Sequence, residues 1–316
     1  MNGMSRIRIL SFAVAASVAA MLCLSTGASS AAPFNQGPKT CQECHKSEVD
    51  VWKDTKHAKS FKTVHKTDKA KAILKAIGAK SMKKEATCGL CHYTAVQKDA
   101  DSKAKPKAGP SCESCHGASS EWLDIHNDYG GKSVKRDDET PEHKAQRKEQ
   151  AAAAGMIWPS NLYDVASNCM SCHGLANPDL DGETLSAMLA GEHPLKPDFE
   201  LVRYSQGVVR HRFYPPDVNT NQEMTPAELA RMFVIGQAAK LVSATEAASK
   251  SDNATYQAAQ QKRRDGATQA LSGVAEAAAF LADPTHANGR ALAQAIGDKD
   301  LSASVGGLLP ESSSYK

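Results

Sequence analysis

Residues 41–45 read Cys-Gln-Glu-Cys-His, two cysteines separated by two residues and followed directly by a histidine. The same spacing returns three more times, and the four copies use every cysteine of the chain except Cys23. Two thiols and a histidine at this spacing are typical of c-type haem attachment, in which the thiols bond to the porphyrin and the histidine binds the iron. The copies are Cys41-Gln-Glu-Cys44-His45, Cys88-Gly-Leu-Cys91-His92, Cys112-Glu-Ser-Cys115-His116 and Cys169-Met-Ser-Cys172-His173.

Eight cysteines could also form disulfides, and paired cysteines could bind zinc. Neither alternative explains why a histidine follows every pair. We therefore predict four covalently bound haems with iron, held by the eight cysteines and by the four motif histidines as proximal ligands. Four apolar macrocycles would also help to fill the interior of a chain in which only 5% of the residues are aromatic.

The beginning of the chain predicts a secretory signal peptide. Arg6 and Arg8 precede an apolar run over residues 9–24, and small residues follow. This run is shorter than the roughly 20 residues that a membrane-spanning helix needs. We expect cleavage near Ala32, loss of Cys23 with the signal, and a periplasmic protein, with outer-membrane association or an extracellular location as further options.

The charge of the chain is uneven. The formal net charge is only +3, which gives no indication of a nucleic-acid partner. Residues 46–107, however, contain sixteen lysines, no arginine and seven acidic residues, which predicts a basic surface near the first two motifs. Such a surface could balance haem propionates or could bind an acidic redox partner, and the sequence favours neither.

The ordered set of motifs resembles the cytochrome c-554 family of tetrahaem cytochromes. The shared features are a Cys-x-x-Cys-His-Lys start, Trp-Lys-Asp-Thr-Lys-His-Ala-Lys at 52–59, and Cys-Glu-Ser-Cys-His-Gly at 112–117 with a histidine ten residues after His116. The matching part runs from about Lys39 to His173. The resemblance implies a mainly α fold, a multihaem cytochrome c fold wrapped around four haems stacked in close pairs.

Seven further histidines are candidate ligands on the far side of each iron, and two of them lie close to a motif. His57 is on a predicted helix that begins just after the first motif, together with Trp52, which could pack against a macrocycle. His126 is the histidine ten residues after His116. The resemblance implies that His57 binds the third haem, on His116, and that His126 binds the first, on His45.

The fourth and second haems have less obvious partners. For the haem on His173 we favour His211 as the second ligand, with His193 next. For the haem on His92 the resemblance implies no distal side chain and a high-spin iron, whereas His193 would saturate this iron if it bound there. The sequence leaves the two options open.

The predicted function is electron transfer, because two imidazoles on one iron keep it low-spin and leave no position for a substrate. We expect redox protein partners, such as other cytochromes, a dehydrogenase or a quinol-oxidising membrane protein. The alternative is an enzyme or a small-ligand site, for nitric oxide for example, at a five-coordinate haem on His92.

From about Thr220 the sequence becomes rich in Ala, Gln, Ser and Lys and contains no cysteine, which predicts a helical extension. Thr225-Pro-Ala-Glu228 is typical of a helix start with a capping box. Apolar residues at helical spacing over 271–281 predict an amphipathic helix, with breaks near Pro284 and at Gly297. These helices could cover the haems or allow self-association. The expected segments are a signal peptide (1–32), a tetrahaem cytochrome c domain (33–219) and a helical C-terminal extension (220–316).

Overall fold

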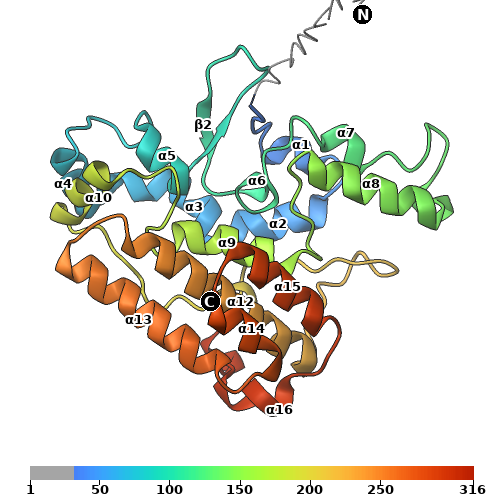
Figure 1. The fold of residues 1–316 in the computed structure, drawn as a ribbon. Coiled ribbons are helices and arrows are strands. Elements are labelled where there is room, and N and C mark those ends of the chain that lie inside the picture. Colours follow the sequence, from blue (N-terminus) through green and yellow to red (C-terminus); the bar gives the residue numbers. More distant parts are fainter. Residues whose placement is uncertain (1–31) are drawn as a thin grey trace, which may run out of the picture. The chain divides into compact units, whose positions relative to one another are not determined.

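Short helices carry the four cysteine motifs, and each motif histidine stands at a helix boundary (Figure 1). The computed structural model describes residues 32–316, so the rest of the predicted signal peptide, including Cys23, lies outside the described residues. The helices of the motif region are α1 (Pro38–Gln42), α2 (Lys46–Asp54), α3 (Lys56–Thr63), α4 (Asp68–Ala76), α5 (Ala86–His92), α6 (Cys112–His116), α7 (Leu123–His126), α8 (Pro141–Ala153), α9 (Leu162–Cys172), α10 (Gly182–Ala190) and α11 (Leu201–Ser205).

The helix predicted after the first motif is interrupted at Thr55. Its first part, α2, contains Trp52, and its second part, α3, contains His57. The Thr55 side chain accepts a hydrogen bond from the backbone N–H of Ala58, so it caps the start of α3. This break changes the direction in which the His57 ring leaves the chain.

A two-stranded antiparallel sheet connects the second motif to the third. Strand β1 (Thr94–Val96) follows α5 directly, and β2 (Lys105–Ala108) leads into α6. The Thr94 hydroxyl lies 2.9 Å from that of Ser111, which caps α6. The hairpin therefore holds the second and third motifs at a fixed separation.

The carboxy-terminal helices begin as the sequence predicts. The Thr225 side chain accepts from the backbone N–H of Glu228, and the Glu228 carboxylate accepts from the backbone N–H of Thr225, which confirms the capping box. The predicted breaks are also confirmed, by the end of a helix at Ala282 and by Gly297, whose φ is 49°. The helices are α12 (Pro226–Ala248), α13 (Ala254–Leu271), α14 (Ala278–Ala282), α15 (His286–Ile296) and α16 (Ser302–Val305).

The continuous helix predicted over 271–281 is wrong. Helix α13 ends at Leu271, Val274 is extended, and the chain becomes helical again with a 3-10 turn at Ala275–Ala277 that leads into α14. Gly273 follows the capping Ser272, and glycine is poorly helix-forming because of its backbone freedom. The apolar residues still point inward, since Leu271 and Val274 are both buried.

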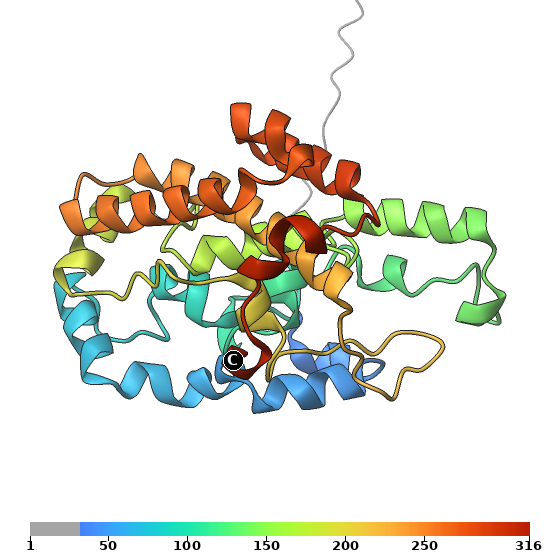
Figure 2. The ribbon, with the colours of Figure 1, turned by 90° about the horizontal axis from the view of Figure 1, so that it is seen from below.

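One hydrophobic core joins the carboxy-terminal helices to the motif region. Helix α12 lies at its centre and is buried on most sides, and α9, which carries the fourth motif, packs on it through Tyr163, Ala166 and Met170 (Figures 1 and 2). Pro33–Lys316 accordingly form one compact unit. The division at residue 219 stays a prediction about the sequence. No helix among residues 32–316 has the length and apolarity needed to cross a membrane.

Candidate haem-binding site

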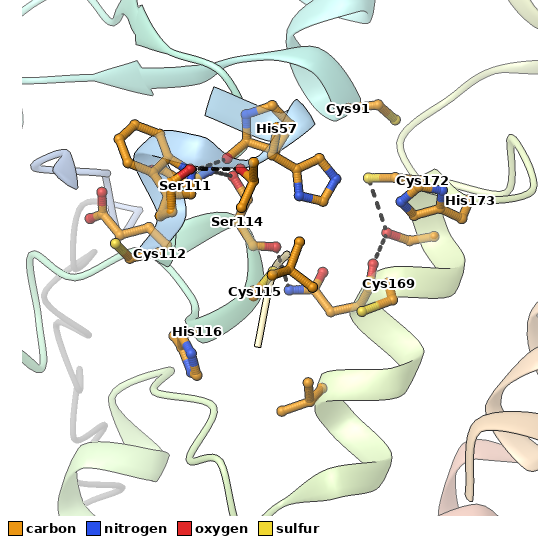
Figure 3. A pocket seen from close by; sticks show the side chains of 18 of the residues that line it. His57, Cys91, Ser111, Cys112, Ser114, Cys115, His116, Cys169, Cys172 and His173 are labelled. Carbon is orange, nitrogen blue, oxygen red and sulfur yellow. Dashed lines mark hydrogen bonds between the residues drawn. The ribbon is translucent and has the colours of Figure 1, made fainter. Parts of the chain in front are cut away.

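A large cavity runs through the motif region. Its volume is about 2770 Å³, and all eight motif cysteines line it. Figure 3 shows a part of it, in which cysteines of the second, third and fourth motifs lie close together. Pockets for single small molecules usually measure about 300–1,000 Å³, so this cavity has room for several cofactors. Trp52 is also among the lining residues and donates a hydrogen bond of 2.8 Å from Nε1 to the Pro110 carbonyl, which fixes its indole ring.

Each motif histidine in this cavity faces one other histidine. A metal ion lies about 2 Å from an imidazole nitrogen and so about 3 Å from the ring centre, which puts two rings on opposite sides of one iron about 6 Å apart. The described residues contain no group of three or more histidine, cysteine or acidic side chains placed as metal ligands. The distances between ring centres are 6.4 Å for His45 and His126, 6.1 Å for His92 and His193, 6.5 Å for His116 and His211, and 6.0 Å for His173 and His57.

His57 does not face His116, which is the partner that the resemblance implies, but His173. The backbone of His57 lies so close to Gly109 that a Cβ on that glycine would be 2.0 Å from the His57 carbonyl oxygen. This contact fixes helix α3 against the segment that leads into the third motif. The His57 ring extends past this motif toward the fourth. The structure therefore brings His57 to the fourth motif and not, as the resemblance implies, to the third.

His211 likewise faces His116 and not His173, the partner that we favoured. It follows a segment that is held by the last described residues of the chain. The N–H of Val208 donates to the Lys316 carbonyl at 3.0 Å, and the N–H of Lys316 donates to the Arg203 carbonyl at 2.9 Å. This contact directs His211 to the third motif, and sequence spacing gives no sign of it.

The two remaining pairs bear on the open questions. His126 lies opposite His45, as the resemblance implies. His193 lies opposite His92, at the position for which the resemblance implies no side chain. The structure therefore favours the option in which the second site has two histidines.

The ring nitrogens are arranged as they are in metal-bound histidines. Ligating histidines usually donate their second N–H to a carbonyl or a carboxylate, which orients the ring. Because a carbonyl can only accept, the proton must be on Nδ1, and Nε2 keeps its lone pair. The Nδ1 atoms of four rings lie by carbonyl oxygens: His116 by Ile157 at 2.8 Å, His193 by Pro194 at 3.0 Å, His211 by Val209 at 2.7 Å, and His126 by Leu123.

Burial keeps several of these rings neutral. It lowers the pKa of His92 and of His173 to about 4, so both retain a lone pair at pH 7. Two histidines outside the cavity have other partners. The Nδ1 of His143 is 2.8 Å from the Glu139 carboxylate, and that of His286 is 3.1 Å from the Tyr163 hydroxyl.

No disulfide joins the motif cysteines of the described chain, and their side chains bring the motifs together in pairs. The Cys41 thiol of the first motif contacts Cys112 of the third, and Cys91 of the second contacts Cys172 of the fourth. Cys115 of the third motif lies next to the fourth motif (Figure 3). The motifs therefore adjoin in the order first, third, fourth, second.

Glu113 is a buried carboxylate inside the third motif that the sequence analysis did not identify. It is 4% exposed, and it accepts hydrogen bonds from the backbone N–H groups of Gln36 at 2.8 Å, Gly37 at 2.7 Å and Ser119 at 3.1 Å. These bonds connect the segment before the first motif to the third. Its place between two cysteines gave no signal, because the spacer residues of such motifs vary in type.

Arg147, on α8, holds His126 in a similar way. Its guanidinium forms two bonds of 2.7 Å to the Glu139 carboxylate and donates to the His126 carbonyl at 2.6 Å. The bidentate bond to Arg147 lowers the pKa of Glu139 to about 2. Both side chains are buried, so this pair fixes the backbone at the histidine that faces the first motif.

Comparisons with known proteins gave two matches. A family described as cytochrome c554 and c-prime matches residues 40–117. Cytochrome c-554 of Nitrosomonas europaea is 32% identical over 163 residues, which is 49% of this chain and 64% of the relative. The match thus spans a little less than two thirds of the relative's length. No solved structure gives a significant match.

Proposed function

We propose that this chain belongs to the cytochrome c-554 family, which its haem-motif region resembles, and that it is a tetrahaem electron-transfer protein. The observation that carries the proposal is the set of four histidine pairs, one for each Cys-x-x-Cys-His motif. A bound c-type haem supplies one-electron exchange at its iron. The residues of the chain would hold each haem, supply both ligands of its iron and place neighbouring haems close together.

The histidine pairs support a carrier and not an enzyme. The two thiols of each motif would hold a haem, and the two facing imidazoles would both bind its iron, which would leave no position for a substrate. The alternative function depended on an open iron at His92. His193 faces His92 with its Nδ1 bonded to a carbonyl and its Nε2 free, which supports a closed iron at this site.

The contacts between motifs support rapid transfer along a row. Electron tunnelling weakens steeply with distance, so neighbouring haems exchange electrons well only when their edges are close. The contacts between Cys41 and Cys112 and between Cys91 and Cys172 would bring the haems held there close together in two pairs, and Cys115 would link the pairs. The proposed path ends at the first and second motifs, on either side of the third and fourth.

We further propose a periplasmic location and partners that are themselves redox proteins. The lysine-rich part of the chain reaches the cavity rim near the second motif, where Lys84 and Lys103 are exposed. A basic rim at one end of the proposed path suits an acidic redox partner, because opposite charges speed and orient encounters. Transfer to such a partner should then slow as ionic strength rises.

The test is a haem count combined with the spin state of the purified protein. We expect four haems per chain by the pyridine haemochrome assay, and a wholly low-spin spectrum by electron paramagnetic resonance. His193→Ala should keep four haems and convert one of them to a high-spin form that binds carbon monoxide when reduced. His65→Ala, which changes a histidine that does not line the cavity, should match the parent protein.

Two results would contradict the proposal. Fewer than four haems per chain would show that a motif is not used. A high-spin haem in the parent protein that His193→Ala leaves unchanged would show that His193 does not close the second site, and it would restore the small-ligand function.

A further inference from the structure

Arg263 is a buried cation in the carboxy-terminal helices. It lies on α13 with an exposed fraction of 1%, in phase with buried Tyr256, Ala259 and Ala267 on the inner face of that helix. Its neighbour Arg264 is instead bonded to Gln261 on the outer face. Burial of an arginine is costly unless its charge is compensated, so the surroundings of Arg263 call for an explanation.

The guanidinium is packed directly on the fourth motif. A Cβ placed on Gly174, which follows His173, would lie 2.4 Å from the Arg263 Cζ, so only glycine leaves room for the arginine there. Its Nη2 also lies 3.9 Å from the sulfur of Met170, inside the motif. Arg263 therefore packs against the segment that carries the motif histidine of the fourth site.

Neutral groups alone hold this charge in place. Nη1 donates to the Gln260 Oε1 at 2.6 Å, and Nη2 donates to the Ser243 Oγ at 3.1 Å. Gln260 in turn donates to the Gly174 carbonyl at 3.0 Å, and Ser243 to the Met170 carbonyl at 3.1 Å. The same two residues thus position the arginine and fasten it to the motif.

No carboxylate of the described chain compensates Arg263. None of its aspartates or glutamates forms an ion pair with the guanidinium, and the ionisable side chain that acts most on its pKa is Tyr256. Burial lowers the pKa of Arg263 to about 10, which leaves the group charged at pH 7. A second buried cation, Lys240 on α12, acts on the same region, and the carboxylates of Glu200 and Asp198 act on this lysine.

We propose that Arg263 raises the reduction potential of the haem attached at Cys169 and Cys172. Reduction adds one negative charge to a haem, and a nearby cation in a low-dielectric interior stabilises that charge with little screening by salt. The inference rests on the proposed haem at this motif. It assigns to the carboxy-terminal helices a part in setting the order of potentials along the row, in addition to covering the site.

Two changes test this on the haem-loaded protein, by redox titration followed optically and by electron paramagnetic resonance. Arg263→Gln removes the charge, whereas Gln260→Glu keeps the arginine and places a carboxylate against it. Each should lower the potential of one of the four components, with a change of about tenfold in its reduction equilibrium constant, which is about 59 mV for one electron. Arg263→Lys should largely retain the parent potential.

Arg264→Gln is the matched control, because it removes the same charge one residue away on the outer face, and it should leave all four components unchanged. The inference is overturned if Arg263→Gln or Gln260→Glu, carrying four haems, titrates like the parent protein, or if all four components shift together. If Arg263→Gln fails to bind its haems, Gln260→Glu alone decides. A missing fourth haem in the parent protein would instead contradict the proposed function, and the haem count shows this separately.

Discussion

The motif region and the carboxy-terminal helices fill their interiors by different means. Around the first three motifs the interior is mostly cavity, and the largest group of buried apolar side chains there is small, with Ala70, Met82, Cys88 and Tyr93 as its members. Around α12 the interior is packed with apolar side chains such as Phe233, and the helix has almost no exposed face. One half of the chain therefore surrounds space for cofactors, and the other surrounds its own side chains.

This difference indicates two sources of folding free energy. In the carboxy-terminal half the burial of apolar side chains supplies it, at about 25 cal/mol for each Å² removed from water. In the motif half most of the apolar surface has no protein partner, so cofactor binding must contribute much of the folding free energy, as metal binding does in small metal-dependent domains. Helix α9 belongs to both halves, since it carries the fourth motif and packs on α12.

The largest expected effect is the response to loss of the haems. A full-length chain with all eight motif cysteines changed to serine should lose the structure of its motif region, because nothing else fills the cavity. Hydrogen exchange followed by mass spectrometry should find α2 to α6 unprotected and α12 and α13 still protected. Equal protection of the two halves, or equal loss, would contradict the division drawn above. The haem-loaded parent provides the reference pattern.

The buried Glu113 carboxylate connects the segment before the first motif to the third motif, so its loss should rank next. Glu113→Gln keeps the shape of the side chain but turns one acceptor oxygen into an NH₂ group that faces backbone donors. Hydrogen bonds to a charged group contribute about 1.5–3 kcal/mol each, so we expect a loss of about 3 kcal/mol in the unfolding free energy. Denaturant unfolding of the haem-loaded protein, followed by absorbance, measures this.

Glu43→Gln is the control for this change, because Glu43 is exposed and should be neutral within about 0.5 kcal/mol. If the two variants unfold at the same denaturant concentration, the Glu113 carboxylate does not hold the first and third motifs together. Loss of exchange protection in α12 alone in the Glu113→Gln variant would likewise contradict the distinction between the two halves, since Glu113 has its partners in the motif half.

Local signals in the sequence gave the parts of the fold that depend on neighbouring residues. The capping box at Thr225 and the break at Gly297 are fixed within one or two helical turns, and both were predicted. The continuous helix predicted over 271–281 was wrong, because apolar spacing alone cannot tell a continuous helix from two short ones that bury the same face.

The site divides in the same way. The residues of the cysteine motifs can be recognised from the sequence alone. The histidine that faces each motif histidine depends instead on packing between distant segments. His57 is placed by the contact of α3 with Gly109, and His211 by the contact of its segment with Lys316, neither of which has a local signature. Arg263 lies in the charged run Gln-Gln-Lys-Arg-Arg-Asp, where only its phase with Ala259 and Ala267 indicates that it is buried.

The smallest expected effect is an acid response confined to the motif half. Glu139 has a folded-state pKa of about 2 against an ordinary value of 4.5, so its bond to Arg147 stabilises the fold fully above about pH 4.5 and is lost as the pH falls toward 2. Arg147 would then release the His126 carbonyl, and the haem proposed at His45 should change its spin state in this range. Optical titration of the haem-loaded protein between pH 5 and 2 measures it.

Glu139→Gln should remove this acid step, because the titrating carboxylate is gone, and it should already weaken the hold on His126 at pH 7. Glu142→Gln, on the exposed face of the same helix, should leave the step in place. The carboxy-terminal half should not respond in this range, since its buried charged side chains on α12 and α13, Lys240 and Arg263, are cations that stay charged in acid. Loss of exchange protection in α12 at the same pH as the change at His45 would mean that the two halves unfold together. The two halves would then differ in how their interiors are filled but not in their stability to acid.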